Sequence, residues 1–313
     1  MSEAGISSEF EYSASFLRIL LPGLTIVTLA SYLLILKFPN IFLFFKKSIT
    51  ESVWAVLPIG AIFVTASIIF GLLISNLVTP LTRILEGYYL EHNIKNILQN
   101  RQWKKFGESW KNYNSADVGF ERDKAYYYVY YHFSHCLYEM TNNSEIKIDS
   151  DKLNNKLKKY ILPTKLGNVF RSMEIYPGWK YGLNGVFFWD RIMLLVPDEN
   201  REPIDKRFAL VAMFIELTWI FFFAAFVYST VLAYDGNQIL SAVSFGGFLL
   251  LSYFSYTMSV QAAVEFGIYV RSIFDLYREE LWDKMKYGQF VKLDSLPEKE
   301  RWNTIFSYLY FYK

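Results

Sequence analysis

Four stretches of the chain are almost continuously apolar and long enough to cross the roughly 30 Å hydrocarbon core of a bilayer, which takes about 20 helical residues. Backbone polar groups find no water in lipid, so each stretch is expected to be a helix that satisfies them internally. The first is not a signal peptide, because it is too long and glutamates precede it instead of a basic region. The pattern predicts an all-α membrane protein with four transmembrane helices, over residues 16–36, 53–78, 208–234 and 238–263.

Between the second and third spans, apolar positions recur at helical spacing among polar ones. No run in which apolar and polar residues alternate one by one is long enough to predict a sheet. The fourth span continues past residue 263 with apolar positions still at helical spacing, up to a stop expected near Gly288. This amphipathic extension needs a partner, either the soluble segment or a neighbouring subunit. The predicted organisation is a transmembrane hairpin at 1–80, a helical cytoplasmic segment at 81–207, a second hairpin at 208–263, and a cytoplasmic amphipathic helix and tail at 264–313.

A shorter apolar run covers residues 183–196 and carries Asp190 and Arg191 in its middle. It is too short and too charged to span a bilayer. Two interpretations stay open: a core helix of the soluble segment, or a helix lying in the membrane interface.

Basic residues at the span ends indicate the orientation, because cytoplasmic loops are enriched in Lys and Arg. The short turn at 235–237 has none, whereas Lys37, Lys46 and Lys47 in the first loop point the other way. We therefore expect both termini and the soluble segment in the cytoplasm, with the spans in the plasma membrane. The supporting flanks are Arg18, Arg83, Arg201, Lys206, Arg207, Arg271 and Arg278.

Glu216 lies eight residues into the third span, about 12 Å from its inner end. An ionisable group at that depth is costly unless it is paired, neutralised or hydrated, which makes it a candidate for an ion path. The alternative is a hydrogen-bonded structural glutamate. Ser244, Ser252, Ser255 and Ser259 follow one face of the fourth span. Such stripes usually pack helices together, but a stripe facing Glu216 would line a pore.

The second span carries Ser67, Gly71 and Ser75 at intervals of four. Small residues at this spacing let two helices approach closely, so a helix-packing seam is expected.

No catalytic signature, phosphate loop or dinucleotide fingerprint occurs, so neither an enzyme nor a cofactor is predicted. His132, His135 and Cys136 share a helical face, but with one further histidine in the chain they are too few for a convincing metal site. The 32 Lys and Arg against 30 Asp and Glu give a net charge of +2, and acidic residues are interspersed among the basic ones, so nucleic-acid binding is not expected.

Two stretches stand out as motifs: residues 162–171 with Tyr176-Pro177, Tyr181-Gly182 and Trp189-Asp190-Arg191, and residues 271–278. Both resemble a family of prokaryotic four-span helical membrane proteins of unknown function. The resemblance covers about residues 160–200 and 265–285, implies paired spans on either side of a soluble region, and brings no activity.

Physically, Pro163 ends one helix, Thr164 can cap the next, and Gly167 permits a close backbone approach. A turn is expected at Tyr176-Pro177-Gly178, and Asn184 can cap the following helix. We further expect this unit to dock the amphipathic extension through complementary charges. The residues assigned to that docking are Arg171, Glu174 and Arg191 on one side, and Asp275 and Arg278 on the other.

The favoured function is an oligomeric ion channel or small-solute transporter, because Glu216 and the serines lie within spans. Four spans enclose little space, so the lipid-embedded chain is expected to form a homo-oligomer. The alternative is a non-transporting membrane scaffold or sensor that recruits a cytoplasmic protein.

Overall fold

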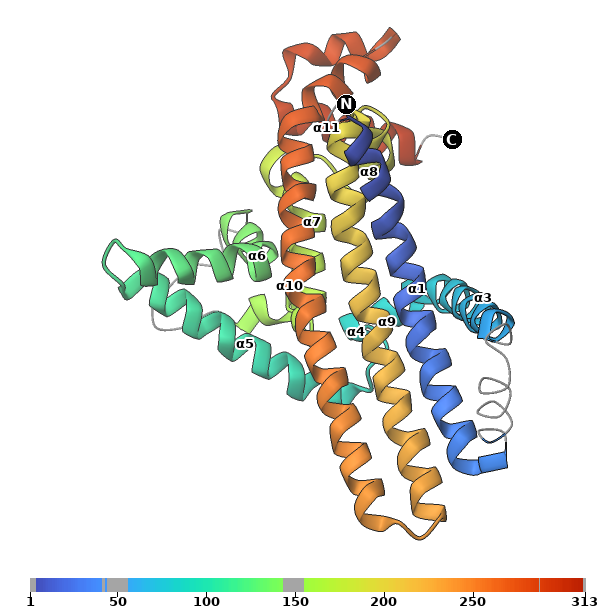
Figure 1. Ribbon diagram of the computed structural model, residues 1–313. Helices are drawn as coiled ribbons and strands as arrows, with labels where there is room; N and C mark the ends of the chain where they lie inside the picture. Colours follow the sequence, from blue (N-terminus) through green and yellow to red (C-terminus); the bar gives the residue numbers. More distant parts are fainter. Residues whose placement is uncertain (1–3, 41–42, 44–55, 143–154, 287, 312–313) are drawn as a thin grey trace. The chain divides into compact units, whose positions relative to one another are not determined.

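The computed structural model describes residues 4–40, 43, 56–142, 155–286 and 288–311, and within these ranges it contains helices and no strand (Figure 1). Lys46, Lys47, the first three residues of the second predicted span and residues 143–154 lie outside those ranges. The helices are α1 (Ala4–Lys37), α3 (Val56–Asn76), α4 (Val78–Glu86), α5 (His92–Ser115), α6 (Phe120–Asn142), η2 (Asn155–Tyr160), α7 (Lys165–Tyr181), α8 (Gly185–Met193), α9 (Asp198–Tyr234), α10 (Gln238–Met285), η3 (Gly288–Ser295) and α11 (Glu298–Phe311).

Four of these helices, α1, α3, α9 and α10, are long and apolar enough to cross a membrane. They coincide with the four predicted stretches. The expected continuation of the fourth span is present, since α10 is one unbroken helix of 48 residues.

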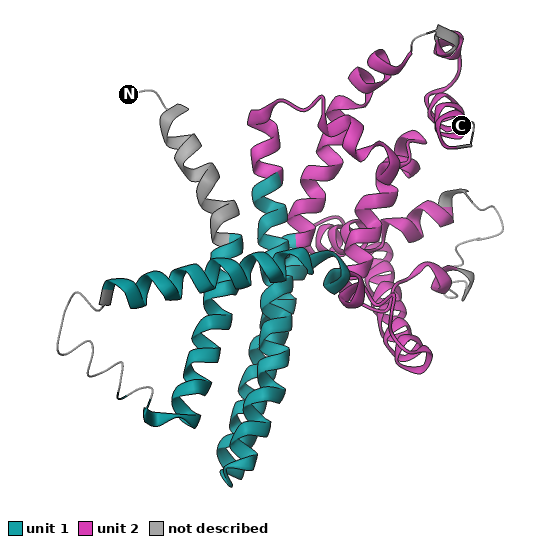
Figure 2. Ribbon diagram, turned by 90° about the vertical axis from the view of Figure 1, so that its right-hand side faces the viewer, with its two compact units in different colours: residues 1–82, 205–262 teal, residues 83–204, 263–313 magenta. Residues whose placement is uncertain are grey.

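The chain divides into two compact units, coloured separately in Figure 2. Unit 1 comprises residues 1–82 and 205–262, and unit 2 comprises residues 83–204 and 263–313. Both α9 and α10 contribute residues to each unit, so the chain passes between the units within helices.

Unit 1 contains the apolar parts of the four long helices. α3 crosses α1 steeply and does not run alongside it (Figures 1 and 2). α9 and α10 run antiparallel, joined by a tight turn at Gly236, whose φ of 79° favours glycine.

Unit 2 is built on aromatic packing. Phe106 of α5 and Phe133 of α6 are fully buried, with ring centroids 5.2 Å apart. α8 belongs to the core of this unit, because Phe188 and Ile192 are fully buried and the Phe188 ring lies 5.3 Å from that of Trp302 in α11. One face of the 183–196 run therefore lies in the core of unit 2, whereas Val186 and Leu194 on this run are 67% and 79% exposed.

The local signals around α7 are confirmed except at one point. The Thr164 hydroxyl accepts a bond from the Gly167 N–H, and the Asn184 side chain accepts one from the Phe187 N–H, so both expected caps form. A Cβ on Gly167 would lie 2.5 Å from the Glu86 carbonyl oxygen, which is the expected close approach. The turn expected at Pro177 is wrong, because α7 continues to Tyr181 and ends at Gly182, whose φ is 78°. Burial of Tyr176 and Tyr181 on either side of Pro177 outweighs the one helical hydrogen bond that proline removes.

Candidate functional site

Glu216 of α9 is fully buried in unit 1 and faces α1. The Arg18 Nε lies 4.0 Å from the Glu216 Oε1, and the Arg18 guanidinium lies 5.5 Å from the centre of the Phe208 ring. Neither carboxylate oxygen nor the Arg18 Nε has a hydrogen-bond partner among the described residues. Arg18 therefore places a positive charge next to Glu216. In the sequence, Arg18 indicated only the orientation of the first span.

The serines of α10 face α9 on its other side. The Ser241 and Ser252 hydroxyls donate to the Ser229 and Thr218 carbonyls at 2.7 and 2.9 Å, and both bonds fit one antiparallel register. A helix turns about 100° per residue, so Glu216 points about 200° away from Thr218.

The remaining serines also take part in packing. Ser255 and Ser259 are buried, the Ser259 hydroxyl donates to the Tyr256 carbonyl at 2.7 Å, and Ser244 is half-buried. Among the described residues, no hydrogen bond joins the Glu216 carboxylate to a serine of this stripe.

The expected seam residues lie where α3 crosses α1. A Cβ on Gly71 would lie 2.0 Å from the Ile19 carbonyl oxygen, and one on Gly23 would lie 1.8 Å from the Ser67 carbonyl oxygen. Ser67 is fully buried, and Ser75 is half-buried farther along α3. Gly23 is the seam residue that the sequence did not single out.

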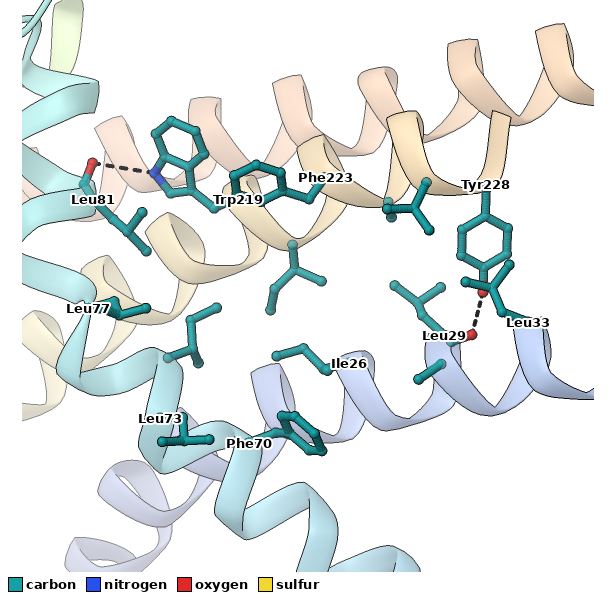
Figure 3. Close-up of a pocket in the computed structure, with 15 residues that line it drawn as sticks. Ile26, Leu29, Leu33, Phe70, Leu73, Leu77, Leu81, Trp219, Phe223 and Tyr228 are labelled. Atoms are coloured by element: carbon teal, nitrogen blue, oxygen red, sulfur yellow. Dashed lines mark hydrogen bonds between the residues drawn. The ribbon is translucent and has the colours of Figure 1, made fainter. Parts of the chain in front are cut away.

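An apolar groove of about 440 Å³ opens in unit 1 between α1 and α9, with the α3–α4 segment across one end (Figure 3). At that end the Trp219 indole N–H donates to the Leu81 carbonyl at 3.3 Å. Farther along, the Tyr228 hydroxyl donates to the Leu29 carbonyl at 2.5 Å. Both polar groups of the lining are thus bonded to backbone, and the other lining side chains are hydrocarbon. They are Ile26, Leu29, Ala30, Leu33, Phe70, Leu73, Ile74, Leu77, Leu81, Ile220, Phe223, Ala224 and Val227.

In unit 2, Asp275 holds α10 against α7. Its carboxylate accepts hydrogen bonds from the Tyr176 hydroxyl at 2.7 Å, the Tyr181 hydroxyl at 2.5 Å and the Lys180 ammonium at 3.2 Å. Burial and the bond to Asp275 raise the pKa of both tyrosines, so they remain neutral donors at physiological pH.

Arg278 reaches a different helix. Its Nε donates to the Glu298 carboxylate of α11 at 3.0 Å, and its guanidinium lies 4.2 Å over the Tyr181 ring. Asp275 and Arg278 thus lie where α10 contacts α7 and α11.

The charge partners expected for this docking are wrong. Arg171 lies near Glu174, and burial raises the pKa of the Glu174 carboxyl, an effect that Arg83 and Arg171 oppose. Arg191 folds back on its own helix, 4.2 Å over the Phe187 ring, and donates to the Phe187 carbonyl. Tyrosine hydroxyls and a lysine take the place of these arginines, because α7 presents its Tyr176–Tyr181 turn to α10.

Arg271, one turn before Asp275, is buried in an aromatic cage that the sequence did not reveal. Its guanidinium lies 4.4 Å from the Tyr130 ring centre, 4.7 Å from that of Tyr131 and 5.1 Å from that of Tyr176. One nitrogen donates to the Tyr130 carbonyl and to the Ser134 hydroxyl. Aromatic faces attract a buried guanidinium, so this cage joins α10 to α6 and α7.

His132, His135 and Cys136 are buried in α6, with the His135 Nδ1 3.1 Å from the Ser172 hydroxyl. Burial lowers the pKa of His132 to about 4 and that of His135 to about 3, so both imidazoles are neutral at pH 7. No group of three metal-ligating side chains occurs among the described residues.

Comparison of the chain with protein-family models, curated proteins and solved structures finds no match. The resemblance based on the two motif stretches stays a prediction.

Proposed function

We propose that this chain is a membrane-anchored scaffold or sensor that does not transport, and that unit 2 recruits a partner protein. The supporting observation is the continuity of α9 and α10, whose apolar spans extend as helix into unit 2. There Asp275 bonds to α7, and the Asn200 amide at the start of α9 donates to the Tyr277 hydroxyl at 2.7 Å. Two spans that end inside a folded domain suit a protein whose task is to hold that domain at a membrane.

The proposed location of unit 2 is the cytoplasm. Its support is the basic residues near the ends of the spans and the absence of any in the turn at 235–237. Membership of the resembled prokaryotic family belongs to the same proposal, which places the spans in the plasma membrane.

The surface we assign to the partner is the turn between α5 and α6. Val118 is 88% exposed and Phe120 is 77% exposed, on either side of Gly119. Large apolar side chains gathered on a domain surface mark interaction sites. The partner is therefore expected to bury an apolar patch on this turn.

A photo-crosslinking amino acid at Val118 in the native cells tests this surface. We expect one dominant protein adduct that the variant Phe120→Asp abolishes. Leu276 is the matched control position, because it is also apolar and is 71% exposed in the same unit. The same adducts from both positions, or none from Val118, would contradict the assignment.

Transport is the second candidate, and the Arg18–Glu216 pair is the observation that favours it. Both Glu216 oxygens and the Arg18 Nε are buried without a hydrogen bond among the described residues, which is unusual unless water or an ion visits them. A pore would need several copies, and α3 offers a contact surface because Leu57 and Ile62 are 65% and 70% exposed. Ion flux separates the two candidates, since only transport requires it.

A further inference from the structure

The apolar groove of unit 1 follows one side of α9. Trp219 and Tyr228 bound that side and lie nine residues apart, which corresponds to about 13.5 Å of helix. The groove has a volume of about 440 Å³.

The chemistry of the lining selects hydrocarbon. The Trp219 indole and the Tyr228 hydroxyl are already bonded to the Leu81 and Leu29 carbonyls (Figure 3). A polar ligand would therefore find no free side-chain partner in the lining and would lose its own hydration.

The groove is open along its length to the surroundings of the spans. Leu73 and Phe223 line it and are 57% and 56% exposed. These side chains belong to helices apolar enough to cross a membrane, so the medium at the opening is lipid.

A cation lies beyond one end of the groove. Lys37 is one helical turn past Leu33 on the same face of α1, and its side chain is 31% exposed. Its ammonium bonds to Asp235 and lies 5.2 Å from the centre of the Tyr234 ring. An ammonium has three donors, so it can also bind a phosphate oxygen. Along α1, the cation and the apolar groove thus follow one another in the same order as the charged headgroup and the apolar tail of a phospholipid.

We infer that this groove binds one acyl chain of a membrane phospholipid whose phosphate contacts Lys37. The site is independent of whether the protein is a scaffold or a transporter. The lipid is an integral part of unit 1, because it fills the space that α1, α3 and α9 leave between them.

Cross-linking tests the site directly. The full chain is reconstituted with phosphatidylglycerol that carries a diazirine in its acyl chain, irradiated, and mapped by peptide mass spectrometry. We expect adducts on α1 residues 26–33 and α9 residues 219–228. Adducts spread evenly over the exposed apolar faces of α3 and α10 would overturn the inference, as would cross-links between two protein copies through the groove.

Variants refine the same measurement. Ala30→Phe fills the groove with an aromatic ring and should abolish the groove adducts, whereas Ala233→Phe on α9, an exposed alanine outside the lining, should leave them unchanged. Lys37→Gln should reduce their yield. The mapping of the wild-type protein decides the question even where a variant fails to fold, and groove adducts that persist in a folded Ala30→Phe protein would contradict the site.

Discussion

Single residues set how closely the helices of unit 1 approach. Gly71 and Gly23 stand where a methyl group has no room, since the opposing atoms are backbone carbonyl oxygens that cannot rotate away. The buried charged residues also have specific neighbours. Arg18 lies next to Glu216, and Arg271 lies among tyrosine rings.

Gly71→Ala should force α1 and α3 apart and lower the free energy of unfolding by about 1–3 kcal/mol, because overpacking a close contact strains the backbone. Gly60→Ala is the matched control on the same helix, since a Cβ there meets nothing within 4 Å. Thermal unfolding of both variants in detergent measures the difference. Equal stability of the two variants would show that the crossing does not form.

The buried histidines of α6 should make unit 2 less stable in acid. Their folded pKa values, about 4 for His132 and about 3 for His135, lie below the ordinary value of 6.5. Unfolding therefore takes up protons below pH 6.5, and each histidine removes up to about 1.4 kcal/mol per pH unit as the pH falls toward its folded pKa.

The measurement is the unfolding midpoint between pH 7 and 4.5 for wild type and for His132→Gln/His135→Gln. The double variant should have the flatter profile. His92→Gln, an exposed histidine on α5, should keep the wild-type slope. Glu86 and Glu174 contribute with the opposite sign, because burial raises their pKa, so the difference between profiles is the readout. Identical slopes for wild type and the double variant would refute the assignment.

Helices of unit 2 are joined by polar contacts between distant parts of the chain. Asp275 of α10 accepts hydrogen bonds from two tyrosines of α7, and Arg278 connects α10 to Glu298 of α11. These contacts lie on the element that continues the fourth span.

Asp275→Asn should destabilise unit 2 by about 1–2 kcal/mol, because it replaces a carboxylate that accepts several hydrogen bonds with a neutral amide. Asp283→Asn is the control: that carboxylate is 63% exposed beside Lys286 and should contribute less than about 0.5 kcal/mol. Thermal unfolding followed by tryptophan fluorescence compares the two. Exchanging charges between Arg171 and Asp275 should rescue nothing, since the two side chains have different partners.

Much of the helical layout could be predicted from the sequence, because its signals are local. The four apolar stretches, the continuity of α10 and the caps at Thr164 and Asn184 depend on residues within a few positions of one another. The pairings could not be predicted. Arg18 and Glu216 are joined only by the packing of α1 on α9, and the helical course through Pro177 depends on tyrosines buried against α10.

At the scale of the whole molecule, the proposed topology puts unit 2 in the cytoplasm and the turn at 235–237 outside. Cysteine labelling can test this, because Cys136, the chain's single cysteine, is buried and burial raises the pKa of its thiol, so background labelling is low. In intact cells a membrane-impermeant maleimide should label Asn237→Cys and spare Val118→Cys. Labelling of Val118→Cys alone would invert the topology.

In the proposed scaffold, the polar groups within the spans hold helices together and do not conduct. The decisive measurement is the flux of K⁺, Na⁺, Cl⁻ and H⁺ through the purified protein in liposomes, for wild type and Glu216→Gln. We expect no flux above protein-free liposomes for either protein. Flux through the wild type that falls or changes selectivity in Glu216→Gln would refute the scaffold proposal and establish the chain as a channel or transporter.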